Sequence, residues 1–195
     1  SIKAVEWYKK LYDEGLIAPD VDRAAARTLF AQGSTAIYDD APVGKSAVLS
    51  QSPDASLGDK MTPIARPVLK AGQTPQHVLW GHLVVVVDGD GSQTAADFAS
   101  WLTSDTAQSE TYFTALGLPP TTDAALSSDA VTSNAFVEAF TSSITATAKP
   151  SPLWKYPAYG QMETAIAEQV QAVLIGQAQP GAAMKSAGEA ISRLL

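Results

Sequence analysis

The chain has 195 residues, of which 46 % are hydrophobic and 17 % charged, and its 13 basic and 20 acidic side chains leave a net charge of −7. This composition excludes an intrinsically disordered chain, because enough apolar side chains are present to form a core. The acidic balance argues against nucleic acid as a partner, since nucleic-acid binders normally show a basic face. The longest uninterrupted apolar run, residues 83–87, is far shorter than the ~18 residues that cross a bilayer.

The chain contains no cysteine. Disulfides, thiolate nucleophiles and cysteine-ligated zinc or iron–sulfur sites are therefore excluded. The first residues already show the pattern of an amphipathic helix and not that of a signal peptide, which is typical of a fragment or a processed product.

Hydrophobic periodicity predicts helices that alternate with short strands. In chain order, the predicted helices run from the start of the chain to Gly15, from a cap at Asp20 or Asp22 to Gly33, from Ser92 through Leu102, from Asp105 to Gly117, over 134–145, from about Gln161 to Gly176, and from Pro180 to Leu194. Capping residues begin the second, third and fourth of these helices, proline occupies the first position of the last one, and glycine ends four of them.

Strands are predicted at residues 35–39, near 60–64 and over 78–87. The third is the strongest of the three, and its continuous β-branched run is typical of a strand that is buried on both faces. The segment 88–91, with the sequence DGDG, is predicted to be a turn; it lacks the later ligands of a calcium loop.

No catalytic motif is present: the chain has no P-loop, no GxGxxG after a strand, no GxSxG and no HExxH. The only two histidines are His77 and His82, which would point to opposite faces of an extended segment and so would not share a metal. We therefore predict a protein that is not an enzyme and needs no cofactor or metal. An enzyme with an unrecognised site stays open as an alternative, and it would require a pocket that pairs a histidine with a carboxylate.

Several stretches follow one another in the order seen in a known family. They are AVEWYKKLYDEGL at 4–16, FAQGSTAI at 30–37, WGHLVVV at 80–86, AADFASWLTSDTAQ at 95–108, GLP at 117–119, and the terminal segments 166–176 and 180–195. Through them the chain resembles the C-terminal half of an extracellular solute-binding protein of family 1, the carbohydrate-binding, maltose-binding-protein-like receptors of ABC importers.

The resemblance implies a fragment of the α/β, periplasmic-binding-protein-like (type II) fold, with a mixed sheet flanked by helices. It assigns residues 1–78 to the C-terminal lobe, 79–122 to a segment that crosses into the N-terminal lobe, and 123–195 to the C-terminal lobe again. It also implies an extracellular, cell-surface or periplasmic protein, anchored to the membrane through an upstream lipoprotein signal that this sequence lacks. Most of the N-terminal lobe would be missing with that signal.

Sugars have apolar faces and hydroxyl edges, so their sites combine aromatic rings with carboxylates, amides or histidine. Three segments of the chain offer such groups. The candidate ligand-binding residues are Asp39, Asp40, Trp80, His82, Trp154 and Tyr156. A purely structural role stays open for each segment. Asp39 and Asp40 would then cap the residues that follow, and Trp80 would be a core residue with His82 an ordinary polar strand residue. Trp154 and Tyr156 would seal the edge of a lobe.

We therefore predict a receptor that captures a sugar or oligosaccharide between two lobes and delivers it to the transmembrane subunits of an ABC permease. The mechanism would be hinge closure, which couples ligand occupancy to a shape that the permease recognises. The alternative is a truncated or stand-alone lobe without ligand competence, with a structural role or with self-association through open sheet edges.

Overall fold

The computed structural model describes residues 1–18 and 21–195. The chain forms two compact units, which are described separately. Unit 1 comprises Ser1–Val21, Leu69–Gln73 and Pro150–Leu195, and unit 2 comprises Asp22–Val68 and Thr74–Lys149. Asp20, one of the two predicted caps of the second helix, lies outside the described residues.

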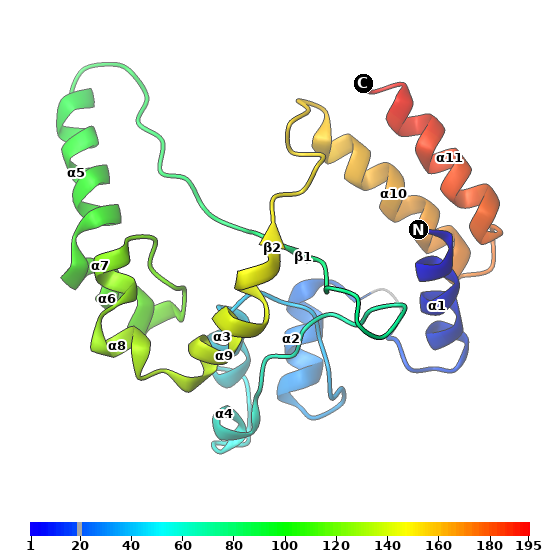
Figure 1. The fold of residues 1–195 in the computed structure, drawn as a ribbon, viewed down its shortest axis with the longest axis horizontal. Helices are drawn as coiled ribbons and strands as arrows, with labels where there is room; N and C mark the ends of the chain where they lie inside the picture. Colours follow the sequence, from blue (N-terminus) through cyan, green and yellow to red (C-terminus); the bar gives the residue numbers. More distant parts are fainter. Residues whose placement is uncertain (19–20) are drawn as a thin grey trace. The chain divides into compact units, whose positions relative to one another are not determined.

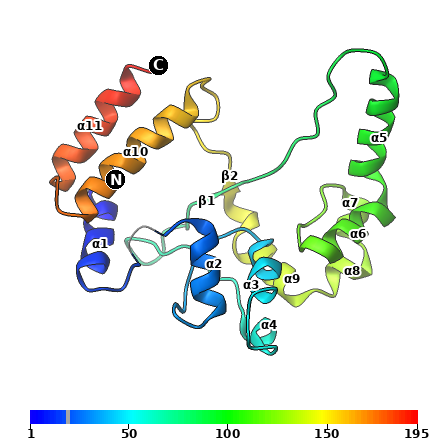
Figure 2. The same cartoon turned by 180° about the vertical axis from the view of Figure 1, so that it is seen from behind.

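Unit 1 is a group of three helices. They are α1 (Ile2–Asp13), α10 (Tyr159–Leu174) and α11 (Pro180–Ser192). α10 and α11 lie side by side, and the N-terminal helix α1 lies against them (Figures 1 and 2). Val5, Val173 and Ala183 bring one buried side chain from each helix into a common core. These three helices confirm the helices predicted at the two ends of the chain, including Pro180 as the first helical residue.

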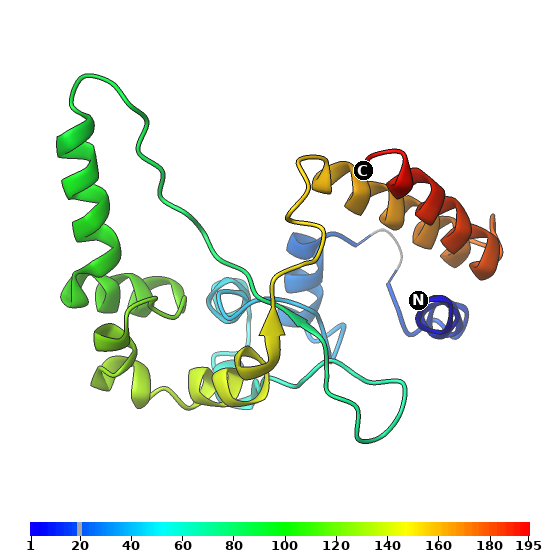
Figure 3. The same ribbon diagram turned by 45° about the horizontal axis from the view of Figure 1, so that its top comes forward.

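Unit 2 holds the remaining elements. They are α2 (Arg23–Ala31), α3 (Gly44–Leu49), α4 (Leu57–Lys60), β1 (His77–Val78), α5 (Ser92–Ser104), α6 (Thr106–Leu116), α7 (Asp123–Leu126), α8 (Asp129–Thr132), α9 (Ala135–Ser143), η1 (Thr145–Thr147) and β2 (Ala148–Lys149). α5 is followed by the shorter helices α6, α7 and α8, and β2 follows α9 and η1 (Figure 3). Phe113, Val131 and Val137 form a buried cluster between α6, α8 and α9.

The helix starts in unit 2 follow from local hydrogen bonding. Asp22 accepts a bond from Ala25 N at 2.8 Å, and Asp105 accepts one from Gln108 N at 2.8 Å. Each bond satisfies a backbone N–H that the first turn of a helix leaves without a partner. The predicted helices at 92–102, 105–117 and 134–145 are therefore confirmed within a few residues, with α9 ending at Ser143.

The sheet is much smaller than predicted. Among the described residues, β1 and β2 form one parallel pair, in which His77 is opposite Ala148 and Val78 opposite Lys149. Leu79 N extends the ladder by donating to Lys149 O at 2.9 Å. The strands predicted at 35–39 and near 60–64 do not form, so the expected mixed sheet is reduced to two short strands.

The prediction of a long buried strand over 78–87 is wrong beyond Val78. Residues 79–87 run as an extended trace from β1 toward α5 without a paired strand (Figure 1). Their large apolar side chains are between 36 % and 90 % exposed. A strand needs a neighbouring strand to satisfy its N–H and C=O groups, and after the bond from Leu79 N to Lys149 O no described residue supplies one here.

The described residues include no helix that is long and apolar enough to cross a membrane. The two units divide the chain at other positions than the lobes expected at 1–78, 79–122 and 123–195. That division into lobes stays a prediction.

Candidate functional site

The first candidate residues lie in the loop between α2 and α3. Gly33 ends the turn after α2 with a φ of +73°, a conformation that glycine adopts without steric cost, and the chain then returns along the helix. On this return the Tyr38 ring packs against Phe30 of α2, with 4.7 Å between the ring centroids. The loop is therefore held to α2 by an aromatic contact next to Asp39 and Asp40.

Asp40 is tied to α2 by a two-pronged ion pair. Its Oδ2 accepts from Arg27 Nε at 2.7 Å and its Oδ1 from Arg27 Nη2 at 3.0 Å, and Ala41 N also donates to Oδ1 at 2.8 Å. The side chain of Asp40 is only 5 % exposed and that of Arg27 21 % exposed. Both carboxylate oxygens are therefore already engaged, and the geometry assigns Asp40 to fixing the loop.

Close packing at the start of α3 completes this cluster. A Cβ placed on Gly44 would lie 2.6 Å from Asp40 Cγ and 2.8 Å from the Tyr38 hydroxyl oxygen. Burial, together with the negative charge of Asp40, raises the pKa of Tyr38 to about 12. The pKa of Arg27 is raised by its hydrogen bond to Asp40. At neutral pH the cluster thus consists of a neutral phenol, a carboxylate and a guanidinium.

Asp39 lies on the exposed side of the same loop. Its Oδ2 accepts from Arg66 Nη2 at 2.6 Å, and both side chains remain largely in solvent. Unlike Asp40, the Asp39–Arg66 pair leaves a carboxylate oxygen and several guanidinium N–H groups without a hydrogen-bond partner in the described part of the chain, so it can exchange hydrogen bonds with a solute.

The backbone of Arg66 connects this pair to the sheet. Arg66 N donates to His77 Nε2 at 3.1 Å, so the proton of the neutral imidazole must lie on Nδ1, which contacts Thr147 Oγ1 at 2.9 Å. Thr147 in turn donates to Ile144 O at 3.2 Å. Burial, followed by the positive charge of Arg66, lowers the pKa of His77. The neutral side chain of His77, on β1, therefore links the backbone at Arg66 to Thr147, the residue directly before β2.

Trp80 and His82 follow directly after β1 and are close to each other. Their ring centroids are 5.8 Å apart in an edge-to-face arrangement. The guanidinium of Arg23, the first residue of α2, lies 5.7 Å from the centre of the Trp80 ring. Trp80 is nevertheless 60 % exposed. A large aromatic face flanked by a cation and an imidazole is thus open to solvent.

Trp154 and Tyr156 belong to unit 1, in the segment before α10, whereas the other four predicted residues belong to unit 2. Successive turns shape this segment, with Trp154 N donating to Ser151 O and Tyr156 N donating to Leu153 O. Lys155 Nζ lies 4.9 Å from the centre of the Tyr156 ring.

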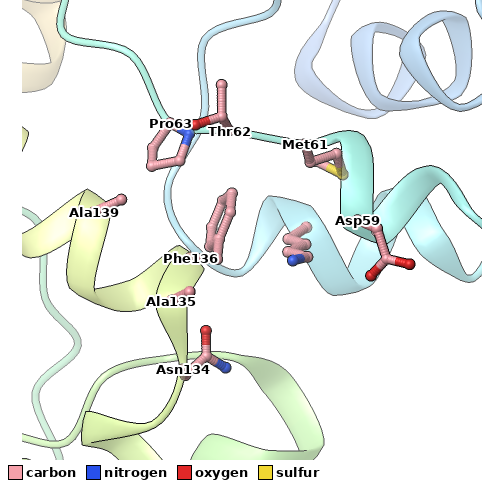
Figure 4. A pocket seen from close by; sticks show the side chains of 10 residues that line it. Asp59, Met61, Thr62, Pro63, Asn134, Ala135, Phe136 and Ala139 are labelled. Atoms are coloured by element: carbon pink, nitrogen blue, oxygen red, sulfur yellow. The ribbon is translucent and has the colours of Figure 1, made fainter.

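A pocket of about 420 Å³ lies in unit 2 between the α3–α4 segment and the start of α9. It is lined by Lys45, Gly58, Asp59, Met61, Thr62, Pro63, Asn134, Ala135, Phe136 and Ala139. The Phe136 ring stands between α9 and the chain after α4 (Figure 4), and Lys45 Nζ lies 4.5 Å from its centre. None of the predicted site residues lines this pocket, and neither does a histidine.

Sequence reasoning missed the three arginines, Arg23, Arg27 and Arg66. Arg27 and Arg66 lie 13 and 27 residues from the carboxylates that they pair with, and nothing in the local sequence connects them. The sequence offered one signal. In a helix that starts after the cap at Asp22, Arg23 and Arg27 are one turn apart and lie on the same face.

The arrangement suits binding more than bond breaking. It offers an exposed indole, cations and a carboxylate, while both nitrogens of His77 are engaged by Arg66 N and Thr147. Among the described residues, no group of three or more histidine, aspartate or glutamate side chains is placed to hold a metal ion.

The chain matches the model of one protein family. The model of the family described as bacterial extracellular solute-binding protein matches residues 1–139, which include Asp39, Asp40, Trp80 and His82. No curated protein matches the chain. The matched segment covers well over half of the sequence. The chain therefore belongs to the family of bacterial extracellular solute-binding proteins, whose role is to bind a solute outside the cell for transport.

Proposed function

We propose that this protein captures a carbohydrate and delivers it to the transmembrane subunits of an ABC permease. The observation that carries the proposal is the indole of Trp80, which is 60 % exposed and flanked by Arg23 and His82. The apolar face of a sugar ring stacks on such an aromatic face, and the groups at its rim exchange hydrogen bonds with sugar hydroxyls.

The loop after α2 supplies the second part of the proposed site. Asp39 and Arg66 form an exposed ion pair whose remaining donors and acceptors suit a hydroxylated solute. Asp40 would not contact the solute. It would instead hold the loop in place, because its oxygens already accept hydrogen bonds from Arg27 and Ala41 N. Trp154 and Tyr156 are proposed as further stacking surfaces in unit 1.

The proposal extends to the wider role. The chain would correspond to the C-terminal half of a maltose-binding-protein-like receptor, with 79–122 crossing to the other lobe and a lipoprotein anchor upstream. It would release the sugar unchanged, without cofactor or catalysis, after closure of the lobes presents it to the permease. The family supports solute binding and transport, while the carbohydrate, the permease and the anchor are our proposals.

Calorimetric titration with a panel of mono- and oligosaccharides tests the proposal. We expect heat with at least one sugar, loss of that heat in Trp80→Ala, and its retention in Trp101→Ala. Trp101 is the matched control, because it lies in the same unit, is 47 % exposed and packs only against Phe98 among the aromatic rings. Absence of heat with every sugar, or equal binding by Trp80→Ala, would overturn the proposal.

A second candidate function is self-association of a chain without ligand competence. The exposed apolar residues between β1 and α5 favour it, because a monomer in water gains nothing by exposing them.

A further inference from the structure

The hydrogen bonds of His77 form a chain with a fixed direction. Arg66 N donates to Nε2 at 3.1 Å, Nδ1 lies 2.9 Å from Thr147 Oγ1, and the Thr147 hydroxyl donates to Ile144 O at 3.2 Å. Because Thr147 gives its only hydroxyl proton to Ile144 O, its oxygen accepts from Nδ1, which must carry the proton of the imidazole. Every donor of this chain therefore has an acceptor only while His77 is neutral.

His77 is also the anchor of the segment that carries Arg66. Residues 62–68 form neither helix nor strand. Among the described residues, the bond from Arg66 N to His77 is the only hydrogen bond that the backbone of this segment makes. The guanidinium of Arg66 meets Asp39, with Nη2 2.6 Å from Oδ2. The position of the Asp39–Arg66 pair thus depends on the Nε2 atom of His77, a residue that is 8 % exposed.

Protonation of His77 would break this arrangement. The added proton lies on Nε2, where it opposes the N–H of Arg66, donor against donor, at a position that water barely reaches. The imidazolium also repels the guanidinium of Arg66, and burial followed by this charge lowers the pKa of His77. Asp39 is the opposing charge and raises that pKa, but it is the smaller cause. On the Nδ1 side of the ring, the only charged residue of η1 and β2 is Lys149, which is exposed.

We propose that His77 is the positioning residue of the solute site and that its protonation releases Arg66, so that the protein binds its solute at neutral pH and releases it in mild acid. This regulation rests on the proposed function, in which the Asp39–Arg66 pair belongs to the solute site. Solute and proton then exclude each other, and linkage limits the loss of affinity to about tenfold for each pH unit below the pKa of His77. A receptor outside the cell meets the pH of its surroundings directly, and histidine is the side chain that titrates in this range.

Calorimetric titration with the panel of mono- and oligosaccharides, at neutral pH and at about pH 5, measures this dependence. We expect the affinity of the unchanged chain to fall at least about threefold in acid. In His77→Gln the amide oxygen can accept from Arg66 N and does not titrate, so binding at neutral pH should stay within about threefold and lose its pH dependence. Equal affinity of the unchanged chain at both pH values, or a pH dependence that persists in His77→Gln and so belongs to His82, would overturn the proposal. Weak binding by His77→Gln at both pH values would show a purely structural role and would equally refute it.

Nitrogen NMR of the chain without any sugar tests the role of His77 separately. The chain has two histidines, so His82→Gln leaves the imidazole of His77 as the only one in the spectrum. We expect the proton on Nδ1 at neutral pH, and an Arg66 amide resonance that shifts with the same midpoint as the imidazole. A proton on Nε2, or titration of His77 without a change at Arg66, would overturn the proposal. Absence of heat with every sugar would instead refute the proposed function, whatever these spectra show for His77.

Discussion

The ion pair between Arg27 and Asp40 is expected to be the main support of the loop between α2 and α3. Replacing Arg27 by alanine removes both guanidinium hydrogen bonds and leaves Asp40 with only the bond from Ala41 N. The carboxylate cannot turn to water without moving the loop, because its side chain is 5 % exposed and Gly44 lies against it.

The burial of Asp40 sets the size of the expected loss of stability. Removing one partner of a buried ion pair costs about 3–5 kcal/mol, because the other charge stays buried without compensation. Arg27 keeps 21 % of its side chain in solvent, so water relieves part of the loss, and we expect about 3 kcal/mol. Arg27→Lys should cost less than Arg27→Ala, since it keeps the charge and loses only the two-pronged geometry.

Denaturant unfolding followed by circular dichroism measures these changes, and the double variant Arg27→Ala/Asp40→Ala closes the thermodynamic cycle. We expect the double variant to be much less destabilised than the sum of the two single variants, because it leaves no uncompensated charge. Arg66→Ala is the comparison, since its pair with Asp39 is exposed and should contribute at most about 1 kcal/mol. A loss below about 1 kcal/mol for Arg27→Ala, or additivity in the cycle, would show that Asp40 does not depend on Arg27 for its compensation.

Gly44→Ala is expected to destabilise unit 2, because the added Cβ would lie 2.6 Å from Asp40 Cγ. Gly188→Ala should stabilise α11, because its Cβ would meet nothing within 4 Å. Thermal unfolding compares the melting temperatures of the two variants with that of the unchanged chain. The gain for Gly188→Ala should be about 0.5–1 kcal/mol. Asp40→Asn should lower the pKa of Tyr38 from about 12, as ultraviolet titration of the phenol would show, because it removes a negative charge. The pKa of His77 is lowered from its usual value of 6.5. As the pH falls below 6.5, the unfolded chain therefore binds more protons than the folded chain, and the free energy of unfolding decreases. His77→Gln should flatten that pH dependence in denaturant unfolding.

The helices could be predicted because the signals that define them are local. Asp22 and Asp105 cap helices by accepting from an N–H three residues ahead, so the interaction is visible in the sequence. α3 was missed because it is short, begins with glycine and has no capping side chain. Its place is set by packing against Asp40 and Tyr38, which local pattern does not contain.

Strands and site contacts could not be predicted in the same way. The β1–β2 ladder joins His77 to Ala148, and its existence depends on a partner that the local pattern does not identify. The β-branched run after Val78 has strand propensity but no described partner, so propensity alone does not produce a strand. For the candidate site, the sequence indicated the carboxylates and Trp80, but Arg66 and its role in linking Asp39 to His77 depend on tertiary structure.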